Sequence, residues 1–141
     1  MEAIDLVSYE IAKKLKACGF NELCQHYYDT EDAPAGHYWR KVISISRNYN
    51  EDILKFSAPT LYAAQKWLRE KKQINVLIGD CACGYYWEVS KAGDEQTRGT
   101  MLIYYDDNGE DENSGMWLSY EKALEAGISA ALDLLAGKEE G

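Results

Sequence analysis

The stretch that decides the fold of this chain is SAPTLYAAQKWLREKKQINVLI, residues 57–78. Thr60 is a good N-cap, and Pro59 disfavours helical geometry at the residue before it, so we expect a helix to begin just after Thr60. Apolar residues then recur at helical spacing, and over residues 74–78 they follow the period of a strand. This junction predicts a helix that leads directly into a strand.

A similar helix opening occurs near the end of the chain, in LSYEKALEAGISAALDLL, residues 118–135. Ser119 is its expected N-cap. Three small residues on its inner face, Ala123, Gly127 and Ala131, would let this helix lie close to a sheet. The two related openings therefore predict two helices that bracket a run of strands.

The N-terminal region is expected to form a first helix over residues 2–18, because its apolar residues recur three and four positions apart. Gly19 suits the left-handed position that commonly ends a helix. Residues 21–36 are mostly polar and contain a proline and a glycine near their end. We expect this second stretch to be irregular.

Five short strands complete the pattern, and they are expected at residues 39–47, 53–56, 74–78, 85–90 and 100–105. Their order with the helices is not the strict alternation of a parallel sheet. We expect an α+β fold, an alpha/beta sandwich in which a mostly antiparallel sheet of about five strands is covered by three helices. Residues 53–56 could pair back on the preceding strand as a hairpin, and residues 106–115 form an acidic loop.

The length and charge of the chain indicate its number of domains and the kinds of partner it is expected to bind. Its 141 residues suit one globular domain, 1–141. The net charge is -9, and residues 71–141 carry 14 acidic but only 6 basic side chains, so nucleic acid is not an expected partner. No apolar run approaches the ~18 residues of a membrane span, and the acidic N-terminus does not look like a secretory signal. We expect a cytoplasmic protein with no membrane partner.

Three stretches, residues 57–72, 84–89 and 119–128, resemble a group of small uncharacterised proteins common in gut Bacteroides-type genomes and their phages. They are also distantly similar to the phage ABA sandwich domain, in which a sheet lies between helices. The resemblance covers about residues 53–135. It implies an alpha/beta sandwich and a phage or mobile-element origin, and it supplies no functional residues to carry over.

Two groups of side chains raise a metal hypothesis. Cys81 and Cys83 are two apart, as are Cys24 and His26, so the four could hold zinc, but neither pair has the two-residue gap usual in structural zinc sites. Whether they converge stays open. The acidic loop fails the calcium-loop pattern at both ends. No motif of a catalytic nucleophile or phosphate loop occurs, and we predict no metal, no cofactor and no catalytic residues. A small metal-dependent or cysteine-using enzyme is the alternative.

The aromatic residues favour protein binding. The chain has 11 Tyr and 4 Trp but only 2 Phe, and rings with a polar edge are enriched at interfaces. We therefore predict a small binding or accessory protein whose partner is an unknown protein. In a more specific form of this hypothesis, the acidic residues of the second half of the chain mimic phosphate groups and block a nucleic-acid-binding enzyme. A homodimer through an exposed sheet edge stays open. The predicted binding residues are Tyr85, Tyr86, Tyr104, Tyr105, Asp106 and Asp107.

Overall fold

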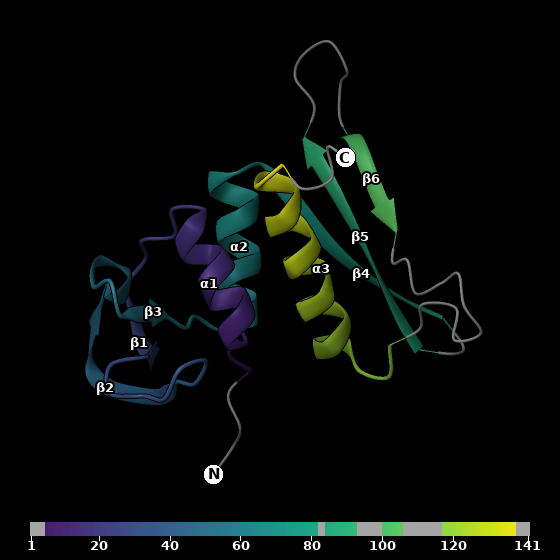
Figure 1. The fold of residues 1–141 in the computed structure, drawn as a ribbon. Helices are drawn as coiled ribbons and strands as arrows, with labels where there is room; N and C mark the ends of the chain where they lie inside the picture. The colour runs from purple at the N-terminus through teal and green to yellow at the C-terminus, as the bar shows by residue number, and fades with distance from the viewer. Residues whose placement is uncertain (1–4, 82–83, 93–99, 106–116, 138–141) are drawn as a thin grey trace. The chain divides into compact units, whose positions relative to one another are not determined.

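The computed structural model describes residues 5–81, 84–92, 100–105 and 117–137 (Figure 1). It confirms a mixed α+β fold with three α-helices and antiparallel strands among these residues. The strands form two three-stranded sheets, where a single sheet of about five strands was expected. The chain divides into two compact units, residues 1–63 (unit 1) and residues 64–141 (unit 2), and each is described by itself. The expectation of a single domain stays a prediction.

Unit 1 consists of one helix and a small antiparallel sheet. Its elements are α1 (Tyr9–Ala17), β1 (Cys24–Asp29), β2 (Trp39–Arg47), the 3-10 helix η1 (Tyr49–Glu51) and β3 (Lys55–Ser57). The strand order is β2-β1-β3, so β1 is the central strand. The bounds of β2 confirm the strand predicted for residues 39–47.

Strand β1 corrects two predictions. It lies in the stretch that was expected to be irregular. It also pairs with β3, so the strand expected at residues 53–56 does not fold back on β2 as a hairpin. The sequence of β1 lacks the alternation that would indicate a strand, because Tyr27, Tyr28 and Asp29 are buried in succession. A central strand that is covered on both faces shows no alternation of polar and apolar residues.

Helix α1 begins at Tyr9, so the predicted start at residue 2 is wrong. Ser8 caps it, because its Oγ accepts a hydrogen bond from the Ile11 N–H at 3.2 Å. The residues before Ser8 are extended instead: the Val7 N–H donates to Pro59 O, and Leu6 forms a β-bridge with Thr60. These partners satisfy the backbone without a longer helix.

Aromatic rings fill the space between α1 and the sheet of unit 1. Tyr9 on α1 lies edge-on to Tyr28 and Phe56 and stacks on Tyr38, with ring centroids 4.3 Å apart in the stack. The buried Tyr28 hydroxyl donates to Val7 O at 2.6 Å. On the other face of β1, Tyr27 stacks on Tyr49. These contacts explain why Tyr27 and Tyr28, which face opposite sides of β1, are both buried.

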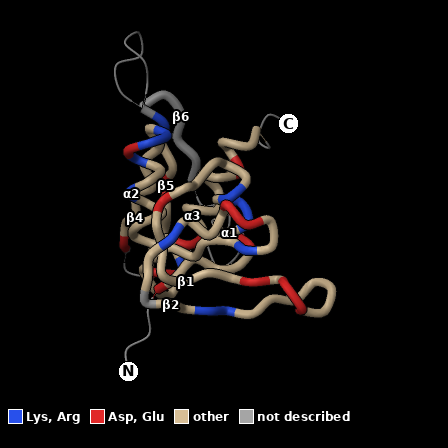
Figure 2. The backbone as a smooth tube through the Cα atoms, turned by 90° about the vertical axis from the view of Figure 1, so that its left-hand side faces the viewer, with Lys and Arg blue, Asp and Glu red and all other residues tan. Residues whose placement is uncertain are grey.

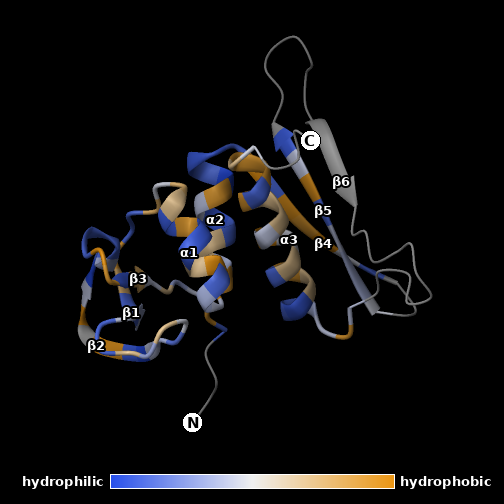
Figure 3. Cartoon of the chain, viewed as in Figure 1, coloured by the Kyte–Doolittle hydropathy of each residue, from blue (hydrophilic) through white to orange (hydrophobic). Residues whose placement is uncertain are grey.

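Unit 2 is a meander of three strands with a helix on one face. Helix α2 (Leu61–Lys71) runs across the boundary between the units and leads into β4 (Ile74–Cys81), β5 (Gly84–Ala92), β6 (Thr100–Tyr105) and α3 (Tyr120–Leu135). The strands pair antiparallel in the order β4-β5-β6. Figure 3 shows hydrophobic colour on β4, β5 and α3, where the core of this unit forms.

The closeness of α3 to its sheet confirms a prediction about its small residues. A Cβ added to Gly127 would lie 2.8 Å from Val76 Cγ1 on β4 and 3.1 Å from Trp87 Cβ on β5. Ala123 and Ala131 on the same face are fully buried. The helix cap is also confirmed, because Ser119 Oγ accepts a hydrogen bond from Lys122 N at 3.0 Å. Among the described helices, none combines the length and apolarity that a membrane crossing requires.

Candidate protein-binding surface

The predicted binding residues Tyr85 and Tyr86 lie on opposite faces of the unit 2 sheet. Tyr85 pairs with Asp80 across β4 and meets the ring of Tyr120, at the start of α3, edge-on with centroids 5.9 Å apart. Its backbone exchanges two hydrogen bonds with Trp117. Tyr85 therefore belongs to the face that α3 covers, and it is half-buried.

Tyr86 lies on the other face, opposite Gly79 of β4. The end of its ring occupies the space that a Cβ on Gly79 would need. Leu77, which is 54% exposed, and Glu88 lie on the same face two residues away along their strands. This arrangement gives Tyr86 a partly exposed apolar neighbour and an acidic one.

For the other predicted binding residues, the structure describes at most the backbone pairing. The register of β6 pairs Tyr104 with Val89 and Tyr105 with Glu88. Asp106 and Asp107 lie outside the described residues, as does the rest of the acidic loop. One continuous surface holding both Tyr85 and Tyr86 is excluded, because adjacent residues of a strand face opposite sides.

Sequence reasoning missed a second surface, on unit 1. It consists of residues 38–47, that is Tyr38 and strand β2, and we call it the β2 edge. Its exposed fractions are 42% for Tyr38, 49% for Trp39, 64% for Val42 and 65% for Ile45. One side of β2 pairs with β1, and no strand in the described part of the chain pairs with its other side. Apolar side chains and backbone hydrogen-bonding groups are thus exposed together.

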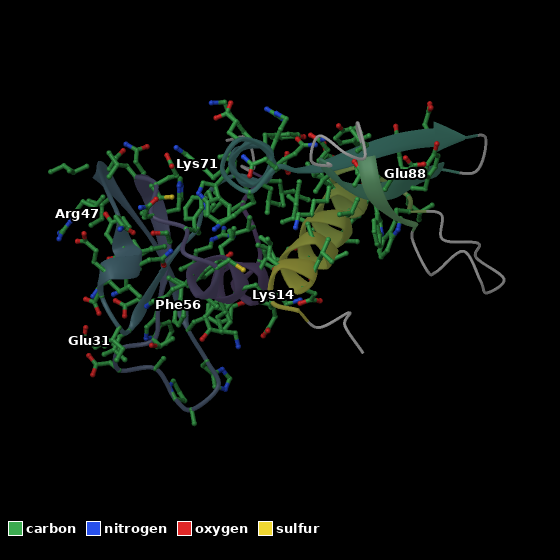
Figure 4. The ribbon with its side chains drawn as sticks, turned by 90° about the horizontal axis from the view of Figure 1, so that it is seen from above. Lys14, Glu31, Arg47, Phe56, Lys71 and Glu88 are labelled. Carbon is green, nitrogen blue, oxygen red and sulfur yellow. The ribbon has the colours of Figure 1, made fainter. Side chains whose placement is uncertain are left out.

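The charge of the β2 edge is opposite to that of the whole chain. It carries Arg40, Lys41 and Arg47, and the 18 residues from 33 to 50 contain no Asp or Glu. Figure 2 shows basic residues in blue on β2, and Figure 4 shows Arg47 pointing outward at the periphery of unit 1. Arg40 forms no ion pair within the described residues.

A buried carboxylate anchors the regular half of β2. Asp29 of β1 is 5% exposed at its side chain and lies 3.4 Å from Lys41 Nζ and 3.9 Å from Lys55 Nζ. Its Oδ1 also accepts a hydrogen bond from Glu31 N at 2.8 Å. Because a buried charge needs such partners, these contacts hold β2 on β1 over residues 39–42. Beyond Val42 the register shifts, so the far half of β2 bulges.

The residues that the structure describes contain no group of three or more possible metal ligands. Of the four residues in the zinc hypothesis, only Cys24 and His26 have described side chains. Cys24 is buried, and burial is the main cause that raises its pKa from 9.0 to about 11. Because the thiolate is the form that attacks and binds metal, this shift disfavours both reactions of Cys24 near neutral pH. Cys83 and the side chain of Cys81 lie outside the described residues.

No family model, curated protein or solved structure matches this chain. The resemblance to phage and Bacteroides-type proteins therefore stays an expectation.

Proposed function

We propose that this protein is a small binding or accessory protein that contacts a partner protein through the β2 edge. The observation that supports this most is the exposure of Val42 and Ile45 on a strand whose outer side pairs with no described strand. Clustered exposed apolar residues on a soluble protein mark interaction sites, and a free strand edge adds unused backbone hydrogen bonds. The cytoplasmic and phage or mobile-element context is part of the proposal and rests on the sequence.

The enzyme alternative has less support. Cys24 is buried, and the described residues contain no group of three or more possible metal ligands. The face around Tyr86 remains a second candidate surface for the same function, because Leu77 is exposed beside it. An experiment on the binding function should therefore compare the two surfaces directly.

The test is site-specific photocrosslinking in a lysate of the source organism. The photoreactive residue benzoylphenylalanine replaces Val42 or Ile45 on the β2 edge, Leu77 on unit 2, or Tyr62 on α2 as a matched exposed control. We expect one dominant protein to be captured at positions 42 and 45 and not at position 62. Capture at 77 alone would move the site to unit 2, and equal capture at all four positions would contradict a specific binding function.

A further inference from the structure

We propose that the partner binds as an extended, acidic segment that adds a strand to the β2 edge. The inference rests on the proposed function and names the chemistry of the segment that is recognised. Strand addition is a common way in which sheets bind peptides: backbone hydrogen bonds provide affinity, and alternate side chains provide specificity. The regular part of β2, residues 39–42, is the stretch where such a ladder would form.

The backbone of β2 is already ordered over the residues where this ladder would form. Residues 39–42 pair in continuous register with residues 26–29 of β1, which is itself paired with β3 on its other side. The ion pair between Lys41 and the buried Asp29 ties the same stretch to the core. A strand that is already ordered loses little conformational entropy on binding, so the cost of ordering falls mainly on the incoming segment.

The charge of the β2 edge identifies an acidic segment. Arg40 and Arg47 have no acidic partner within the described residues, and Lys41 is shared with Asp29 but is 47% exposed at its side chain. Arg40 and Val42 lie on one face of the regular stretch of β2, and Trp39 and Lys41 lie on the other. A segment with Asp or Glu at alternate positions would place its carboxylates beside one of these two cations and its apolar side chains on the opposite face. A basic segment would meet three like charges.

A second copy of this chain is a poorer occupant of the same edge. Pairing of two β2 strands around a two-fold axis would bring Arg40, Lys41 and Arg47 of both copies into one ladder. Like charges that face each other across strands are destabilising. The chain supplies no acidic residue in β2 to offset them. Charge therefore selects a different, acidic segment over self-pairing.

The first test uses two synthetic fluorescein-labelled peptides as long as β2, which has nine residues. One alternates Glu with Val, and the other alternates Lys with Val. Fluorescence polarisation with the full-length protein should show saturable binding of the Glu peptide and none of the Lys peptide. Equal binding of both, or binding of the Lys peptide alone, would overturn the proposal.

The second test asks whether the acidic peptide binds as a strand. Two versions of the Glu peptide carry N-methyl groups on alternate residues, so that each loses the N–H donors of one edge only. Strand addition uses one edge of the peptide. We expect one version to lose binding and the other to retain it. Retention by both would show a purely electrostatic contact and would overturn strand addition.

The third test locates the site with charge-neutral variants. Arg40→Gln and Arg47→Gln should each weaken binding of the Glu peptide about twofold to fivefold, the range for exposed ion pairs. Arg69→Gln and Lys71→Gln on α2 remove the same charge from exposed positions and should leave binding unchanged. Circular dichroism checks that each variant is folded. An equal loss in both sets would contradict a site on the β2 edge.

Two further outcomes separate this inference from the proposed function. If light scattering shows a dimer that Arg40→Gln strengthens, the edge is occupied by a second copy and the acidic-segment proposal is wrong. If neither peptide binds but photocrosslinking at positions 42 and 45 still captures one protein, the binding function stands and strand addition by an acidic segment fails.

Discussion

Cys24 shows how burial can dominate the chemistry of one side chain. Its pKa is raised to about 11, mainly because the thiolate would lose its hydration in the core of unit 1. We expect alkylation of Cys24 by iodoacetamide near pH 8 to be at least about a hundredfold slower in the native protein than in urea, since the thiolate fraction falls by that factor. Mass spectrometry of the alkylated peptides measures this rate separately from those of the other cysteines.

The same pKa shift predicts a pH dependence of stability. The thiol ionises near 9.0 in the unfolded chain and near 11 in the folded one, so the folded state binds the proton more tightly. The contribution is complete below pH 9 and is lost as the pH rises from about 9 to about 11. Cys24→Ala should flatten the unfolding free energy over that window. An unchanged slope would show that Cys24 is accessible to water.

Gly127 provides a prediction in which two residue-level effects oppose each other. Helix propensity alone favours Gly127→Ala by about 1 kcal/mol. The added methyl group would, however, lie within 3.1 Å of both Val76 and Trp87, and overpacking costs roughly 1–3 kcal/mol. We expect no gain, and a net loss of up to about 2 kcal/mol in urea unfolding. Ala126→Gly, on a less buried face of α3, is the control for propensity; a stabilised Gly127→Ala would contradict the close packing.

Single residues were predictable where local chemistry determines them. Ser119 and Gly127 could be read from capping preference and side-chain size, which depend on neighbours in sequence. That Tyr85 and Tyr86 lie on opposite sides of the sheet also follows from the alternation of side chains along a strand. Whether each tyrosine is exposed enough to bind a partner depends on the positions of α3 and Tyr120, which only the folded structure shows.

At the level of elements, the bounds of β2 could be predicted from the sequence, but its position at the edge of the sheet could not. Its period-two pattern fixes the strand at residues 39–47. The same pattern does not reveal that β2 is an edge strand, because this depends on β1, which lacks alternation. The one available signal was the acid-free run of residues 33–50 in an acidic chain. That run marks the β2 edge only once the strand order is known.

The exposure of β2 predicts that its apolar residues contribute little to folding. Val42→Thr and Ile45→Thr should change the unfolding free energy by less than about 0.5 kcal/mol, as exposed substitutions usually do. The matched control, Val89→Thr on β5, places a hydroxyl in a fully buried position and should cost about 1–3 kcal/mol. Urea unfolding measures all three. A cost at Val42 as large as at Val89 would show that β2 is covered and is not a free binding surface.

Across the whole molecule, charge is distributed unevenly between the units. Residues 64–141 hold 15 of the 24 acidic side chains and 8 of the 15 basic ones, while the acid-free run of residues 33–50 lies in unit 1. Net charge was readable from composition, but a basic strip inside an acidic chain has meaning only when its residues share one exposed strand. The strip gives a chain of charge -9 one local region of positive charge.

This distribution predicts that salt acts on folding and on binding with opposite signs. Like charges in the acidic chain repel one another, and screening by ~0.5 M NaCl reduces this repulsion, so the unfolding free energy should rise. The attraction between the β2 edge and an acidic peptide is screened by the same salt, so the affinity for the Glu–Val peptide should fall. Urea unfolding and fluorescence polarisation over one salt series measure both. If the affinity rose with salt, apolar contact at Val42 and Ile45 rather than charge at Arg40 and Arg47 would dominate recognition.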